Sequence, residues 1–145
     1  MSYKIHNTKD WPLSKLQPYG AGILQALRKI ARRYKEDISL ELLAKEILNG
    51  DRVLWLILKD QHFKALFTTR IEENLVGKKC LWILELAGQG GLSLTEIYKE
   101  LEGYARAQSI SQIAILGRFG WARRLRKLGY VPFMAQYKKD ILNDS

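Results

Sequence analysis

The segment at residues 78–133 constrains the fold more than any other part of the chain. An apolar run at residues 80–87 ends in the sequence Gly88-Gln89-Gly90-Gly91, and apolar residues at helical spacing follow over residues 93–108. A second apolar run covers residues 112–116. This order predicts a strand, a glycine loop, a helix and another strand. Because a helix N-terminus presents unpaired N–H groups, the glycine loop is a candidate phosphate-binding site.

The chain of 145 residues has the length of a single domain, residues 1–145, and its pattern divides it into three regions. Residues 1–19 show no clear period, which predicts an extended lead-in with one candidate short strand at residues 3–5. Residues 20–49 carry apolar side chains at helical spacing and predict two helices. Residues 52–141 are expected to form the sheet and to contain the glycine loop.

Three apolar runs joined by short polar turns predict an antiparallel meander of strands at residues 53–58, 63–71 and 80–87. The connection from the third strand through the helix to Ile113 is long enough for a crossover to a parallel strand. An apolar stretch after Gly129 predicts a final strand. The expected fold class is therefore α/β (α+β), with a mixed and mostly antiparallel sheet.

The charge of the chain limits its partners. The formal net charge is +9, and the chain has no acidic residue between Glu102 and Asp140. Such a surplus favours a polyanionic partner, namely nucleic acid, a phosphorylated cofactor or an acidic protein surface, although a solvated basic face is the plain alternative. Neither a membrane span nor an apolar signal core is apparent, so a cytoplasmic protein is expected. One cysteine and two histidines do not predict a metal site.

Glu85 is the only carboxylate in the apolar run at residues 80–87. A carboxyl group buried in such a strand takes up a proton more readily, which suits it to accept one from an amine, directly or through a water molecule. The alternative is that Glu85 faces solvent or pairs with an arginine. The residue is therefore a candidate catalytic base with a structural role as the competing interpretation.

The order of these elements resembles that of the GCN5-related N-acetyltransferases, the GNAT family. The basic segment Gly117-Arg118-Phe119-Gly120-Trp121-Ala122-Arg123-Arg124-Leu125, followed by Leu128-Gly129-Tyr130, is most similar to small GNAT-like proteins encoded by bacteriophages. The resemblance implies a sheet with a V-shaped split after the fourth strand, flanked by about four helices. It also implies that acetyl-CoA binds in this split.

The resemblance implies roles for particular residues. The pantetheine arm would lie along Leu84, Glu85, Leu86 and Ala87, the pyrophosphate on Gln89, Gly90, Gly91, Leu92 and Ser93, and the outer phosphates near Arg118 and Arg123. The sequence departs from the family pattern at two places. Leu92 and Leu94 stand where the loop usually has small residues, and Leu125 stands where a tyrosine usually serves as general acid.

Three functions fit these observations. The first is CoA-dependent N-acyltransfer from acetyl-CoA to an amine of unknown identity. The second is a catalytically inactive GNAT-like phage protein that binds another protein, in the virion or in the host cytoplasm. The third is nonspecific nucleic-acid binding through the basic residues 118–127, for which the sequence offers charge but no recognised motif.

Overall fold

The computed structural model describes residues 3–35, 37–88, 94–116 and 122–142. Its elements in chain order are β1 (Lys4–Asn7), α1 (Leu13–Leu16), a 3-10 turn η1 (Gln17–Tyr19), α2 (Gly20–Arg33), α3 (Leu40–Leu48), β2 (Val53–Lys59), β3 (His62–Glu73), β4 (Lys79–Gly88), α4 (Leu94–Ala107), β5 (Gln112–Ile115) and α5 (Ala122–Lys127). None of the helices within these ranges is both long enough and apolar enough to span a membrane.

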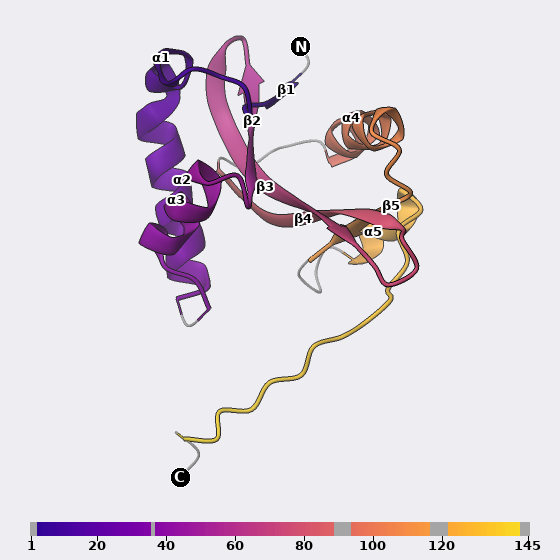
Figure 1. Cartoon of the computed structure of the whole chain (residues 1–145). Helices are drawn as coiled ribbons and strands as arrows, with labels where there is room; N and C mark the ends of the chain where they lie inside the picture. The colour runs from indigo at the N-terminus through magenta and orange to yellow at the C-terminus, as the bar shows by residue number, and fades with distance from the viewer. Residues whose placement is uncertain (1–2, 36, 89–93, 117–121, 143–145) are drawn as a thin grey trace.

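The five strands form one sheet in the order β1-β2-β3-β4-β5, with the helices on its two sides (Figure 1). The pairs β1–β2, β2–β3 and β3–β4 are antiparallel. The pair β4–β5 is parallel, and α4 provides the crossover between these two strands. The expected meander, the crossover and the mostly antiparallel mixed sheet are confirmed.

Each face of the sheet has its own hydrophobic core, because the strands are apolar on both faces. On one face α2 and α3 bury Leu27, Ile30 and Leu43 against β2 and β3. On the other face α4 buries Ile97, Tyr98, Leu101 and Ala105 against β2, β3 and β4. The sheet is therefore the middle of three layers, and a residue of β4 lies between the α2–α3 layer and the α4 layer.

The lead-in, residues 1–19, was predicted to be extended because its sequence lacks a periodic pattern. The structure shows that it also contains helical turns. The predicted strand is present as β1, but α1 and η1 follow it before α2 begins. Pro12 precedes α1 with a φ of −68°, and Pro18 occupies the first turn of η1. Both are positions where the missing N–H of proline costs a helix no hydrogen bond, so the prolines start helical turns here.

The final strand predicted after Gly129 is not formed. Residues 130–140 have no regular secondary structure, and the chain leaves the body of the protein beyond α5 (Figure 1). The prediction was wrong because apolar content favours a strand only when a neighbouring strand supplies hydrogen bonds. The tail (residues 131–142) is exposed, and its apolar side chains are Val131, Phe133, Met134, Tyr137, Ile141 and Leu142.

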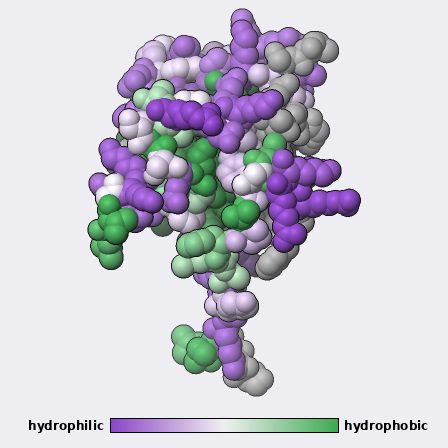
Figure 2. Space-filling model, turned by 90° about the vertical axis from the view of Figure 1, so that its right-hand side faces the viewer, coloured by the Kyte–Doolittle hydropathy of each residue, from purple (hydrophilic) through white to green (hydrophobic). Residues whose placement is uncertain are grey.

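Figure 2 shows the face that carries α4, β5 and α5. Apolar surface lies in the middle of this face and again toward the end of the tail, with hydrophilic side chains around it. Leu116, which follows β5, is 58% exposed here. Leu116 also lines the opening described next, so the end of β5 combines exposed apolar surface with that opening.

Candidate active site

The two parallel strands β4 and β5 pair over only part of their length. Residues 80–83 pair with residues 112–115, and the Leu116 N–H donates to the Ile83 carbonyl at 3.3 Å. Beyond Ile83, β4 continues to Gly88 while paired with β3 alone. Among the described residues no strand pairs with the other edge of residues 84–88, which we call the open edge of β4. The split after the fourth strand is therefore present.

A β-bulge lies where the split begins. Thr69 of β3 stands opposite Ile83, but the next residue, Thr68, stands opposite Glu85, so Leu84 is an extra residue on β4. A bulge bends its strand and increases the local twist. The bulge at Leu84 thus coincides with the end of the pairing between β4 and β5, beyond which the backbone groups of the open edge have no strand partner among the described residues.

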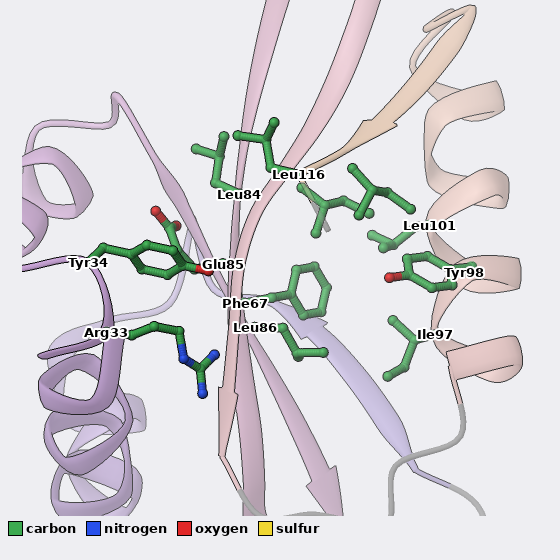
Figure 3. A pocket seen from close by; sticks show the side chains of 12 residues that line it. Arg33, Tyr34, Phe67, Leu84, Glu85, Leu86, Ile97, Tyr98, Leu101 and Leu116 are labelled. Carbon is green, nitrogen blue, oxygen red and sulfur yellow. The ribbon is translucent and has the colours of Figure 1, made fainter. Parts of the chain in front are cut away.

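A crevice lies at this split (Figure 3). It holds about 450 Å³ of open space when the solvent at its mouth is included, but only about 20 Å³ is wide enough to admit water, which is room for roughly one molecule. The crevice is thus a narrow slot that must widen to admit a chain of atoms. Its lining is mostly apolar and consists of Arg33, Tyr34, Phe67, Ile83, Leu84, Glu85, Leu86, Ile97, Tyr98, Leu101, Ile115 and Leu116.

Glu85 pairs with an arginine, which was the alternative considered for it. Its two carboxylate oxygens each accept a hydrogen bond from Arg52 Nη1 at 2.5 Å, and one of them also accepts from the Thr68 hydroxyl. The Glu85 side chain is 10% exposed and lies on the α2–α3 side of β4, where it lines the crevice. The carboxylate is therefore fixed in place by two partners at the point where the strands separate.

Arg52 joins Glu85 to a second carboxylate. Its Nε donates to Glu46 of α3, which also receives Arg70 Nη2 at 3.5 Å. Burial alone would lower the pKa of Arg52, but the hydrogen bonds and charges of Glu46 and Glu85 outweigh burial and raise it. The guanidinium thus stays charged, and the network ties α3 to β3 and β4 below the crevice.

Two tyrosines on the α4 side of the crevice were not singled out as site residues by the sequence. The Tyr98 hydroxyl points from α4 into the crevice (Figure 3), and its ring lies 5.5 Å from that of Tyr130. Burial raises the pKa of Tyr98 to about 12, and burial together with the charge of Glu102 raises that of Tyr130 to about 12. Both hydroxyls therefore remain protonated at neutral pH. The helical pattern at residues 93–108 by itself does not distinguish a tyrosine that lines a crevice from one in the core.

Leu125, at the expected tyrosine position, packs beside these residues. It is half-buried on α5 and contacts the core of the α4 layer together with Leu128 and Tyr130. Of the four residues expected along the pantetheine arm, Leu84, Glu85 and Leu86 line the crevice. Ala87 does not, because its side chain is buried against the α2–α3 layer.

The expected phosphate-binding residues lie largely outside the described ranges. This applies to Gln89, Gly90, Gly91, Leu92 and Ser93, and to Arg118. Arg123 is described and is exposed on the first turn of α5.

Gly88, the last residue before the loop, has a φ of +153°, and a Cβ placed there would lie 2.4 Å from the Lys64 carbonyl oxygen. A side chain does not fit at this position. The glycine therefore allows β4 to pass close to β3 as it enters the loop.

The comparisons with known proteins agree with this geometry. No protein-family model and no curated protein matches the sequence. Solved structures do match, among them glucosamine-6-phosphate N-acetyltransferase from Arabidopsis thaliana, with 13% identity, a TM-score of 0.66 and coverage of 97% of this chain and 99% of that one.

Two further structures match over 97% of this chain. A predicted acetyltransferase from Clostridium acetobutylicum, solved with acetyl-CoA, has 14% identity and a TM-score of 0.60 over 96% of its own chain. An aminoglycoside acetyltransferase from an uncultured soil metagenomic sample, solved with sisomicin, has 9% identity and a TM-score of 0.63 over 95% of its chain. At these identities the likeness shows the fold alone.

Proposed function

Since the chain has the fold of the GCN5-related N-acetyltransferases, we propose that it transfers an acyl group from CoA to an amine. The observation that carries this proposal is the open edge of β4, which faces an apolar crevice at the split from β5. Among the structural neighbours, one was solved with acetyl-CoA and another, an aminoglycoside acetyltransferase, with sisomicin. These neighbours support a CoA thioester as donor and an amine as acceptor.

The described residues fit a pantetheine arm by their chemistry. An open strand edge offers N–H and C=O groups to a ligand that carries amides, as it does to an added strand. The apolar walls from Leu84, Leu86 and Leu116 suit the methylene groups between those amides. Acetyl-CoA, when bound, supplies a thioester carbonyl that an amine can attack. We assign the pyrophosphate to the loop of residues 89–93 and the outer phosphates to Arg118 and Arg123.

Glu85 and Tyr98 provide the two proton-transfer groups of the proposal. Glu85 approaches the crevice from the α2–α3 side, and Tyr98 approaches it from the α4 side (Figure 3). Because Arg52 and Thr68 contact the Glu85 carboxylate directly, we assign Glu85 the attraction of the incoming ammonium and the acceptance of its proton through a water molecule. Tyr98, protonated at neutral pH, is assigned proton donation to the departing thiolate.

Calorimetric titration of acetyl-CoA tests this function. We expect micromolar binding to the native chain and its loss in Leu116→Trp, because the larger side chain fills the narrow slot between the strands. Leu48→Trp is the matched control, since Leu48 is 87% exposed at the end of α3 and does not line the crevice. Gly91→Glu adds a negative charge to the loop and is expected to weaken binding as well.

If the protein does not bind acetyl-CoA at millimolar concentration, the proposed acyltransferase function is refuted. The remaining interpretation would then be a GNAT-fold protein that binds another protein, as proposed from the missing tyrosine at Leu125. Equal binding by Leu116→Trp and the native chain would instead show that acetyl-CoA binds somewhere other than the split.

A further inference from the structure

Two cationic side chains of α2 extend toward β4, and one of them, Arg33, lines the crevice. Lys29 and Arg33 are four residues apart and therefore lie on one face of the helix. Lys29 Nζ donates to the Gly88 carbonyl oxygen at 3.5 Å, at the end of the open edge of β4. Arg33 lines the crevice, and Figure 3 shows its guanidinium extending from α2 toward β4 on the side where Glu85 lies.

Neither Lys29 nor Arg33 forms a salt bridge within the part of the chain that the structure describes. The salt bridges there involve the cations Arg52, Arg70 and Lys138. Asp37, beyond the end of α2, is paired with Lys138. A shallow, open hollow on the same helix adds three more cations, Arg28, Arg32 and Lys35. The α2 side of the crevice mouth is therefore strongly positive.

We propose that the acceptor is an amine that also carries a phosphate or carboxylate group, which Arg33 and Lys29 bind while the amine faces Glu85. This inference rests on the proposed function and adds the chemical class of its acceptor. Glu85, whose carboxylate is already paired with Arg52, and Arg33 both line the crevice, and Lys29 reaches the carbonyl oxygen of Gly88 at the end of the open edge of β4. A zwitterion can place its amine beside Glu85 and its anionic group beside Arg33, whereas a polycationic amine would be repelled by the cations of α2.

Acceptor binding and turnover are measured with matched pairs that differ in one anionic group. Glucosamine 6-phosphate is compared with glucosamine, and alanine with alaninamide, each in calorimetry with and without acetyl-CoA and in an acetyl-transfer assay. For at least one pair we expect the anionic member to have a kcat/KM or an affinity about tenfold higher, because charge-assisted hydrogen bonds are the strong ones. This preference should shrink as salt is added, while the neutral member is unaffected.

Two arginines that are adjacent in sequence provide the variant and its control. Arg33→Gln is expected to lower affinity for the preferred anionic amine about tenfold and to leave its neutral twin unchanged. Arg32→Gln removes the same charge from the neighbouring hollow, outside the crevice lining, and should change either member less than about twofold. Both side chains are exposed, so thermal unfolding should show both variants folded like the native chain.

The outcomes separate this inference from the function on which it rests. The acceptor class alone would be overturned if acetyl-CoA binds but neither anionic amine binds more tightly than its neutral counterpart. The same holds if acetyl-CoA binds and neither anionic amine binds at all. Preference for sisomicin or for a nucleic acid at this face would overturn it as well. An Arg33-dependent preference for an anionic amine without any binding of acetyl-CoA would support the anion site and refute the acyltransferase.

Discussion

Among the residues of the candidate site, Arg52 is expected to contribute most to the free energy of unfolding. It is 11% exposed at its side chain and pairs with Glu46 and Glu85, which are 22% and 10% exposed. Removing one partner of a buried ion pair leaves an uncompensated charge, so we expect Arg52→Met to lower the free energy of unfolding by about 3–5 kcal/mol. Urea unfolding followed by circular dichroism measures this.

The exposed pair Lys138–Asp37 provides the control for Arg52. Its side chains are 57% and 56% exposed, so Lys138→Met should cost less than about 1 kcal/mol. The double variant Arg52→Met with Glu85→Gln should lose less free energy of unfolding than the sum of the losses in the two single variants. The reason is that position 85 then carries no charge that lacks its partner. Similar costs for Arg52→Met and Lys138→Met would contradict the buried network.

Tyr98 and Tyr130 should make the fold sensitive to alkaline pH. Their pKa values are raised to about 12 in the folded state, whereas an unfolded tyrosine titrates near 10. Between these values the unfolded chain binds fewer protons than the native chain, so stability falls as pH rises from about 10 to 12. Absorbance titration at alkaline pH should show late-ionising tyrosines, and Tyr98→Phe should remove one of them. Simultaneous ionisation of all seven tyrosines in the folded protein would refute this.

At the scale of elements, two glycines predict opposite effects of the same substitution. Gly88→Ala at the end of β4 places a Cβ 2.4 Å from a β3 carbonyl oxygen at a φ of +153°, so we expect a loss of about 2 kcal/mol or more. Gly103 lies in α4 with no atom within 4 Å of the added Cβ, and Gly103→Ala should gain about 0.5–1 kcal/mol. Thermal unfolding of the two variants gives both signs, and a neutral Gly88→Ala would show that β4 can move away from β3.

The elements themselves could be predicted from the sequence wherever one local pattern was sufficient. The runs at residues 53–58, 63–71 and 80–87 became β2, β3 and β4, since a strand rich in apolar and β-branched residues is buried whichever partner it takes. Helix α4 followed from its apolar spacing in the same way. The prediction of a strand in the tail was wrong. The tail is also apolar, but no strand pairs with it among the described residues.

At the scale of the whole molecule, the tail is expected to contribute little to folding. Its residues are exposed, and the ion pair that Lys138 of the tail forms with Asp37 is exposed too. Deleting residues 131–142 should therefore lower the free energy of unfolding by less than about 1 kcal/mol. Thermal unfolding at several protein concentrations tests this. A large loss that depends on protein concentration would show that a second copy of the chain buries the tail.

The sequence by itself determined the order of elements from α2 to β5 and the mixed sheet, because the spacing of apolar side chains indicates which of them are buried. Only the tertiary structure decided what meets at the split. A bulge at Leu84 lies where the strands separate, Arg52 pairs with a carboxylate 33 residues away, and Tyr98 lines the crevice. Strand register and the pairing of distant charges depend on contacts between elements, and a local pattern carries no record of them.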